Sequence, residues 1–401
     1  MSTPSPSAAP KLYGLYVAAF VDTLGVFLVL ALLPYYAERF GASATQIGAL
    51  VSVFAVAQTL SAPLWGRLSD RVGRRPVILA GLLLSAVAYL LFSYAGSLWM
   101  LFVSRFAQGL GGGTVSAIFA YIADAVRGED RAERIGWVTA ATSAAALLGP
   151  ALGSVAGSVS PALPGLIAAG LCLVAWVLCR SMLEGGARKE SLQSEERPPL
   201  LGALWGVVTA PGRQAHLLIW VYALGMFGNT ALTAVAALAL DRRFGVGVDD
   251  IWIFFAALAG GALVVRLLIL GRTVRRLGEA AVLRLGAVCL ALGLALFPFV
   301  PVLAGVLATV VLMAFGTSFL FPCTTALITR AGEKGAGQLL GVQQAYGGSA
   351  RILGPLLAGW ALERSGLAAP FLLGAAVLAV AALAALGVRQ PEPPGGAAEA
   401  A

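Results

Sequence analysis

The chain has 401 residues, of which 59% are hydrophobic and 11% charged, with 49 glycines and a formal net charge of +8. A water-soluble fold of this length needs more polar surface than these charged side chains supply, so composition excludes an ordinary soluble protein. In a bilayer, helices of about twenty apolar residues are the expected unit.

The apolar runs predict an all-α membrane protein with twelve transmembrane helices. The first run follows an uncharged Ser/Pro/Ala tail and is too long for a cleaved signal peptide, so we interpret it as a span. The predicted spans cover residues 12–33, 45–65, 77–94, 98–122, 135–157, 163–182, 215–240, 250–270, 280–298, 302–328, 338–362 and 368–388.

A long polar stretch after the sixth span divides the chain. We expect a cytoplasmic linker at 184–214 between two six-helix bundles, 12–183 and 215–388, with tails at 1–11 and 389–401. With the N-terminus inside, the inner loops and tails hold 19 Lys and Arg residues and the outer loops hold 4. The positive-inside rule therefore predicts cytoplasmic termini in a multi-pass protein of the cell (plasma or inner) membrane. The basic residues then face lipid headgroups rather than nucleic acid.

The two bundles repeat each other at a constant offset of 205 residues. Gly66-Arg67, Arg71, Gly73 and Gly81 recur as Gly271-Arg272, Arg276, Gly278 and Gly286, and Leu148-Gly149-Pro150 recurs as Leu353-Gly354-Pro355. This offset indicates two pseudo-symmetric bundles with a substrate site near the bilayer midplane. Asp70 corresponds to Arg275, so we expect only the N-terminal half to carry an acid in this segment.

Asp22 is the one carboxylate well inside a predicted span. An acid there costs about 2.5–3.5 kcal/mol on insertion scales, so it normally faces a cavity or a partner. Residue counts along the first and fourth spans place Arg105 at a similar depth, and we expect the two to pair. Separating the pair would let Asp22 bind a proton, which makes Asp22 and Arg105 the predicted proton-coupling residues. The alternative is a static ion pair that fixes helix packing.

Uncharged hydrogen-bonding side chains and a second buried arginine indicate where a small-molecule substrate binds. The predicted cavity residues are Gln108, Asn229, Gln344, Tyr346 and Arg351. Because one acid faces the two arginines Arg105 and Arg351, this cavity is net positive. We therefore expect a neutral, zwitterionic or anionic substrate.

Two runs of small residues predict close helix packing. The run from Gly109 to Gly113 is not a dinucleotide-binding loop, because Thr114 stands where the third glycine is needed. In the fifth span, Gly149 and Gly153 flank Pro150, which bends the helix. The functional interpretation is a bend against the eighth span that seals the outer side. The other interpretation is close packing, and the two are compatible.

The sequence contains no recognisable enzyme chemistry. It has no Gly-x4-Gly-Lys-Ser/Thr loop and no Ser/His/Asp set, so we expect no enzyme. The four cysteines lie in apolar runs and the single histidine, His216, has no Cys or carboxylate cluster nearby. We predict that the cysteines pack as small hydrophobic residues, with no metal and no cofactor other than a proton gradient.

Three motifs make the chain resemble the major facilitator superfamily, and more narrowly its twelve-span drug:proton antiporters. The family's loop 2–3 motif is matched at Gly66, Asp70, Arg71, Gly73, Arg74 and Arg75. Arg105-Phe-Ala-Gln-Gly109 matches the family's Arg-x-x-Gln-Gly element. The antiporter motif of the fifth span is matched at Gly136, Gly149, Pro150 and Gly153, and departs at Ala145 and Ser154, where glycine is usual.

The resemblance implies a network that joins the two bundles on the cytoplasmic side. We call the residues of this network the cytoplasmic latch motif: Gly66, Asp70, Arg71, Gly73, Arg74, Arg75 and Asp124. Asp124 is the expected partner of Arg71 or Arg74, and the resemblance places Asp70 near the start of the eleventh span. The alternative is that these arginines only set membrane topology.

The resemblance also implies secondary active transport by alternating access. We expect a monomer that exports a small drug-like molecule or metabolite in exchange for protons. Proton-coupled uptake or facilitated diffusion would share the fold and most motifs. A non-transporting membrane sensor or assembly partner is the alternative from another class.

Overall fold

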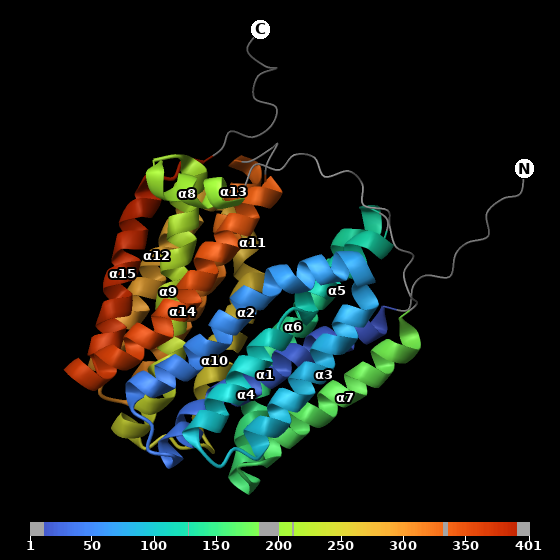
Figure 1. Cartoon of the computed structure of the whole chain (residues 1–401). Helices are drawn as coiled ribbons and strands as arrows, with labels where there is room; N and C mark the ends of the chain where they lie inside the picture. Colours follow the sequence, from blue (N-terminus) through green and yellow to red (C-terminus); the bar gives the residue numbers. More distant parts are fainter. Residues whose placement is uncertain (1–11, 127, 184–199, 211, 332–335, 391–401) are drawn as a thin grey trace, which may run out of the picture. The chain divides into compact units, whose positions relative to one another are not determined.

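The computed structural model describes residues 12–126, 128–183, 200–210, 212–331 and 336–390, and within these ranges the chain is helical with no strand (Figure 1). Eleven helical segments of the described ranges are long and apolar enough to cross a membrane, and two of them, Leu98–Ala125 and Ile251–Leu277, each comprise consecutive helices. A further long helix, α14, is not among them, so the count of twelve spans stays a prediction. The tail at 1–11, most of the C-terminal tail and linker residues 184–199 lie outside the described residues.

The chain forms two compact units. Unit 1 comprises Met1–Phe40 and Val53–Gln193, and unit 2 comprises Gly41–Ser52 and Ser194–Ala401. The helices that contribute to unit 1 are α1 (Tyr13–Arg39), α2 (Ala44–Val72), α3 (Arg74–Ser93), α4 (Leu98–Gly111), α5 (Thr114–Ala125), α6 (Gly128–Val159) and α7 (Leu163–Met182).

Unit 2 is built from α-helices, as unit 1 is, and it also contains a π-helical stretch and a 3₁₀ turn. Its helices are α8 (Leu200–Thr209), α9 (Gln214–Phe244), α10 (Ile251–Val264), α11 (Gly271–Leu277), α12 (Glu279–Leu296), α13 (Leu303–Ala331), α14 (Ala336–Ser365) and α15 (Ala369–Leu386). A π-helical stretch at Val265–Leu270 joins α10 to α11, and a 3₁₀ turn at Phe297–Phe299 follows α12.

Helix pairing within each unit confirms the predicted duplication. In unit 1, α1 packs against α6 and α7, and α3 packs against α4 and α7. In unit 2, the equivalent helix α9 packs against α14 and α15, and α12 packs against α13 and α15. One packing scheme therefore serves both halves of the chain.

The segment predicted as a loop around Gly66 to Arg75 is almost entirely helical. Helix α2 continues to Val72, and Gly73 alone separates it from α3. Gly73 has φ of +95°, a conformation that residues with a Cβ rarely adopt. The backbone therefore favours glycine at Gly73, whereas Gly66 lies inside α2 with open space around it.

The predicted linker contains a short helix, α8, that packs on the rest of unit 2. The Tyr346 hydroxyl donates to the Leu204 carbonyl at 3.0 Å, and the Trp220 indole N–H donates to the Val207 carbonyl at 3.3 Å. Residues 200–209 form a helix, which corrects the prediction of an irregular linker at this point. The apolar run is too short to be distinguished from a linker by its sequence pattern.

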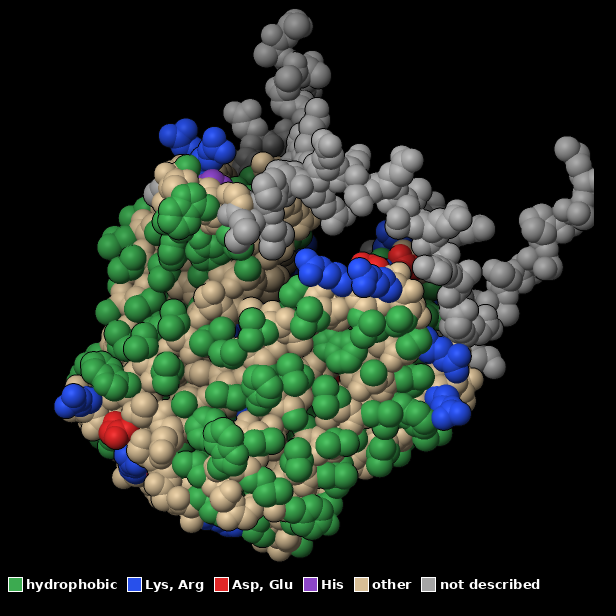
Figure 2. All heavy atoms as spheres, viewed as in Figure 1, with side chains coloured by type: hydrophobic (Ala, Val, Ile, Leu, Met, Phe, Trp, Pro, Cys, Tyr) green, Lys and Arg blue, Asp and Glu red, His purple; other side chains and the backbone are tan. Residues whose placement is uncertain are grey.

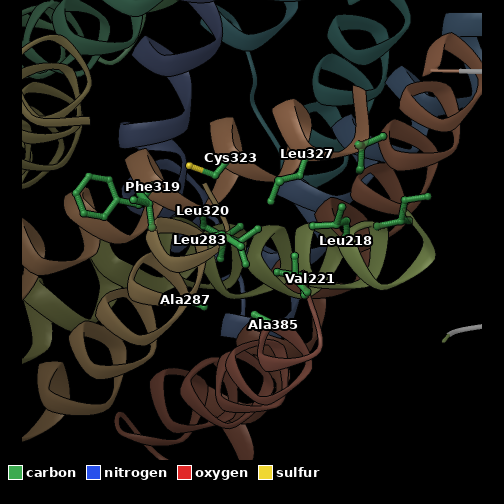
Figure 3. Packing of buried hydrophobic residues seen from close by; sticks show 14 of the residues in the cluster. Leu218, Val221, Leu283, Ala287, Phe319, Leu320, Cys323, Leu327 and Ala385 are labelled. Carbon is green, nitrogen blue, oxygen red and sulfur yellow. The ribbon is translucent and has the colours of Figure 1, made fainter. Parts of the chain in front are cut away.

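Apolar side chains cover the visible helix flanks, and Lys and Arg gather at helix ends (Figure 2). In unit 2, a buried cluster joins α9, α12, α13 and α15 through residues such as Leu218, Leu283, Leu320 and Ala385 (Figure 3). Exposed apolar flanks are the expected surface of helices that face lipid.

The first turns of α2 belong to unit 2 through polar contacts with α14. The Thr45 hydroxyl and backbone N–H donate to Glu363 Oε2 at 2.5 and 3.1 Å, and the Ser52 hydroxyl donates to the Ile352 carbonyl at 2.6 Å. Hydrogen bonds from Thr45 and Ser43 lower the pKa of Glu363, which lies beyond the predicted span.

The glycines of the fifth-span motif let α6 approach α1 closely. A Cβ at Gly153 would lie 2.7 Å from the Leu28 carbonyl oxygen, and one at Gly149 would lie 2.9 Å from the Leu24 carbonyl oxygen. These distances confirm the packing interpretation, with α1 as the partner. Gly136, of the same motif, has no atom within 4 Å of such a Cβ.

We expect Gly153→Ala to destabilise the protein, because its methyl group forces α1 and α6 apart, at a cost of about 1–3 kcal/mol. Gly136→Ala is the matched control, and it should leave stability unchanged or raise it through better helix propensity. Thermal unfolding in detergent measures both. Equal melting temperatures for the two variants would contradict the close α1–α6 contact.

Candidate functional site

The Asp22 carboxylate lies in the middle of α1, with 7% of the residue exposed. It accepts a hydrogen bond from the Ser85 hydroxyl of α3, at 3.4 Å. Among the described residues, Asp22 makes no ion pair. The carboxylate is thus buried in unit 1 with one weak neutral donor.

The predicted ion pair between Asp22 and Arg105 is absent from the structure. Arg105 of α4 is 1% exposed, and its Nη1 donates to the Gln108 Oε1 atom one turn along the same helix. Its guanidinium lies 4.8 Å from the centre of the Phe54 ring, and its Nε has no hydrogen-bond partner among the described residues. A local amide and an aromatic ring, rather than the distant acid, accept this cation.

Tyr89 of α3 links the two charged residues. Its hydroxyl accepts a hydrogen bond from Gln108 Nε2 at 2.5 Å and packs against Gly25 of α1, one turn from Asp22. We call Asp22, Ser85, Tyr89, Arg105 and Gln108 the buried polar cluster; α1, α3 and α4 supply it.

Ser85 and Tyr89 were missed from the sequence, and Gln108 was assigned to the substrate cavity. The signal was present, since polar residues four apart share one face of a helix. Gln108 is 3% exposed and both ends of its amide are bonded, so a place in the buried polar cluster replaces its predicted cavity role.

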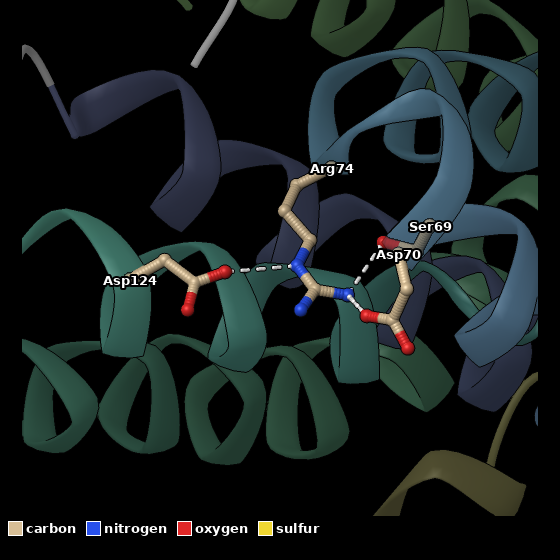
Figure 4. A network of polar contacts seen from close by, with 4 residues as sticks. All are labelled: Ser69, Asp70, Arg74 and Asp124. Atoms are coloured by element: carbon tan, nitrogen blue, oxygen red, sulfur yellow. Dashed lines mark hydrogen bonds and ion pairs between the residues drawn. The ribbon is translucent and has the colours of Figure 1, made fainter. Parts of the chain in front are cut away.

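The cytoplasmic latch motif is organised by Arg74 (Figure 4). Arg74 Nη1 lies 2.7 Å from Asp70 and 3.0 Å from the Ser69 hydroxyl, and Arg74 Nε lies 3.0 Å from Asp124. Of the two partners considered for Asp124, the structure selects Arg74, while Arg71 is exposed. One guanidinium therefore ties the end of α2 to the end of α5.

Arg75 serves a different contact. Its Nη2 donates to the Arg180 carbonyl at the end of α7, at 2.6 Å. The Arg180 guanidinium in turn lies 5.1 Å from the centre of the Trp176 ring. The motif thus joins α2, α3, α5 and α7 at one end of unit 1.

Comparison with known proteins agrees with this architecture. The sequence model of the Major Facilitator Superfamily matches residues 15–347 and 218–401. The chain belongs to the major facilitator superfamily. Like the relatives and structures that it resembles, it is a multi-pass membrane transporter and not an enzyme.

Two relatives from this superfamily span nearly the whole chain. Multidrug resistance protein 2 of Bacillus subtilis (strain 168) is 28% identical over 374 residues, covering 90% of each chain. The class C tetracycline resistance protein of Escherichia coli is 31% identical over 350 residues, covering 84% of this chain and 86% of the relative. The crystal structure of the nucleoside transporter NupG superposes with a TM-score of 0.74 at 16% identity, over 94% of this chain and 99% of NupG, and shows the shared fold.

The second half of the chain also carries an acid in the segment that corresponds to the cytoplasmic latch motif. This differs from the prediction that only the N-terminal half has an acid in this segment. Glu279 lies 205 residues after Arg74 and is 7% exposed. Its Oε1 lies 2.9 Å from Arg330 Nη2, one residue beyond the counterpart of Asp124. The ion pair recurs with its charges exchanged, a change that a search for matching residues does not detect.

No hydrogen bond or ion pair between the remaining predicted cavity residues is found in the described part of the chain. In α14, Gln344 Nε2 lies 3.5 Å from the Tyr222 hydroxyl, whereas the Tyr346 ring packs on Trp220 and its hydroxyl binds α8. Tyr346 therefore holds α8, and this structural role replaces its predicted cavity role. Asn229 and Arg351 are half-buried.

A cavity of about 320 Å³ lies elsewhere in unit 2, and none of the predicted residues lines it. Its walls include Leu240, Phe244, Asp250, Phe254 and Val306. In the described ranges, no group of three metal-ligating side chains lies together. Cys172, Cys179 and Cys323 are buried, as their predicted packing role requires.

We expect Arg330→Leu to destabilise the protein by about 1–2 kcal/mol, because it leaves the buried Glu279 carboxylate without a partner while Arg330 itself is half-exposed. Glu279→Gln combined with Arg330→Leu should recover most of that loss. The measurement is unfolding in detergent. Arg272→Leu is the control, since exposed Arg272 donates to the Leu268 carbonyl in the adjoining π-helical stretch. Identical stability of the Arg330 and Arg272 variants would contradict a stabilising pair.

Proposed function

We propose that this transporter exports a small drug-like organic molecule in exchange for protons, and that Asp22 carries the proton. The observation behind the proposal is the buried Asp22 carboxylate, which has the Ser85 hydroxyl but no ion pair among the described residues. A charged carboxylate without a counter-charge is costly in an apolar interior, and binding a proton removes that cost.

The second half of the chain supports a functional interpretation of the buried polar cluster. Its five members correspond, 205 residues later, to Phe227, Leu290, Leu294, Val310 and Met313, which are all apolar. The same helix pairs pack in both units. Packing therefore does not require polar groups at these positions, which argues against a purely structural cluster.

The proposed cycle moves one proton per turnover through Asp22. In the state described, the carboxyl binds a proton; when water or Arg105 reaches it in another state, the carboxylate is stabilised and the proton leaves to water. Alternating access places these two events on opposite sides of the membrane. Substrate then crosses in the opposite direction, driven by the proton gradient.

Export is the direction that the relatives favour, because they are named for resistance to drugs and to tetracycline. The antiporter-type glycines of α6 agree with that direction. Substrate class is proposed from charge: Arg351 makes no ion pair in the described residues, so a neutral, zwitterionic or anionic substrate suits its surroundings better than a permanent cation.

We expect inside-acid proteoliposomes to accumulate a probe, since outward proton flow drives inward exchange in either protein orientation. Tetracycline and ethidium are the probes. Asp22→Asn should lower the gradient-driven initial rate at least tenfold, whereas Asp249→Asn, an exposed carboxylate outside the spans, should match wild type. Accumulation only in outside-acid vesicles would indicate symport. Gradient-driven accumulation by Asp22→Asn would refute the role of Asp22.

We expect Arg351→Ala to discriminate between the two probes. It should raise the KM for zwitterionic tetracycline severalfold, because it removes a positive charge that would attract the acidic groups of the substrate, whereas the permanent cation ethidium should be transported poorly by both proteins. Transport kinetics at saturating proton gradient provide the comparison. Ethidium transport that is unaffected by Arg351→Ala would contradict the proposed substrate charge.

A further inference from the structure

Tyr89 is the member of the buried polar cluster that binds Gln108 and lies against α1, and no role has been assigned to it so far. It is 1% exposed, and its hydroxyl packs against Gly25 of α1, one turn from Asp22. A Cβ at Gly25 would overlap that hydroxyl. The close approach of α1 and α3 thus places the Tyr89 oxygen beside the helix that carries Asp22.

The Gln108 amide between Tyr89 and Arg105 has one orientation that satisfies both neighbours. Its Oε1 accepts from Arg105 Nη1, and its Nε2 donates to the Tyr89 hydroxyl at 2.5 Å. The flipped amide would turn a donor toward the guanidinium, which has only donors. The guanidinium therefore sets the orientation of the amide, and the hydrogen bond from Nε2 to the Tyr89 hydroxyl holds the other end of that amide in place.

We propose that Tyr89 is a positioning residue for proton coupling: through Gln108 it holds the Arg105 guanidinium against Phe54 and away from Asp22. This rests on the proposed role of Asp22 as proton carrier. Held in this way, Arg105 does not stabilise the Asp22 carboxylate, and Asp22 binds its proton. Release of the guanidinium toward Asp22 favours the carboxylate and expels the proton.

Few titratable or charged groups interact with Tyr89 and Asp22. Tyr89 interacts electrostatically with Asp22 from α1, Arg105 from α4 and Cys172 from α7, and Cys172 also interacts with Asp22. Helix α2 contributes the neutral Phe54 ring, and α3 itself contributes Ser85. Arg105 is thus the cation that can change the charge state of Asp22 in this cluster.

The position of Tyr89 does not require a hydroxyl for packing. Its counterpart in the second repeat is Leu294, which is buried in the equivalent α12. Tyr89→Phe should therefore fold, losing only the acceptor for Gln108. Tyr36→Phe is a matched control, because Tyr36 is also buried in unit 1 but its hydroxyl has no hydrogen-bond partner among the described residues.

The test is an infrared pH titration of the purified full chain in lipid, which needs no substrate. The protonated-carboxyl band that disappears in Asp22→Asn reports proton binding at that residue. In Tyr89→Phe, the midpoint of this band should move toward acid by about one pH unit, since the freed arginine can approach the carboxylate. Tyr36→Phe should titrate like wild type.

A double-variant comparison separates positioning from a general structural effect. Gln108→Ala should shift the midpoint as Tyr89→Phe does, and the combined variant should shift it no further, because both act on the same amide. Gln108→Ala alone carries the test if Tyr89→Phe does not fold. An unmoved midpoint in Tyr89→Phe, or additive shifts, would overturn the positioning role and leave Asp22 as carrier. Absence of any band sensitive to Asp22→Asn would overturn both proposals.

Discussion

A charged side chain inside an apolar helix bundle has no water to solvate it, so its position depends on whichever polar groups the neighbouring helices supply. In this protein the buried cation Arg105 is held by the Gln108 amide and the Phe54 ring, and the buried acid Asp22 faces the Ser85 hydroxyl. This separation of opposite charges within one unit is the condition on which the proposed proton exchange depends. If the two were paired, the arginine would stabilise the carboxylate, and the acid would no longer favour binding a proton.

The two repeats show that one scheme of helix packing is compatible with different side chains at equivalent positions. Helices pair in the same way in both units, and glycines allow close approach in each, as at Gly153 against Leu28 and Gly286 against Phe319. Polar groups occupy the centre of the first unit and apolar side chains the equivalent positions of the second. At the helix ends the ion pair recurs with its charges exchanged, between Arg74 and Asp124 in one unit and Glu279 and Arg330 in the other. Duplication has kept the contacts that hold helices together and varied those that carry charge.

The charged residues of the site could be predicted from the sequence, but the contacts that they make could not. Asp22 and Arg105 stand out because ionisable residues are rare in spans, and the glycine stripes stand out by their spacing. The prediction that Asp22 and Arg105 pair was wrong, because two residues at a similar depth can lie on different sides of their helices. Arg105 binds Gln108, which lies one turn along its own helix. Ser85 and Tyr89 resemble ordinary span residues until the structure places α3 between α1 and α4. Tyr346 was assigned to a cavity by residue type, and its contact with α8 gives it another role.

The amino-acid sequence by itself determined the solvent, the helical class, the duplication and the family. Each of these follows from composition, from runs of about twenty apolar residues or from motifs and an offset repeated along the chain, and none needs contact between distant residues. Tertiary structure alone decided which polar groups meet. Tyr89 and Gln108 are 19 residues apart, and Asp22 and Ser85 are 63 apart, on different helices. Whether such groups bond depends on helix rotation and ångström-scale approach, which the order of residues along one helix does not specify.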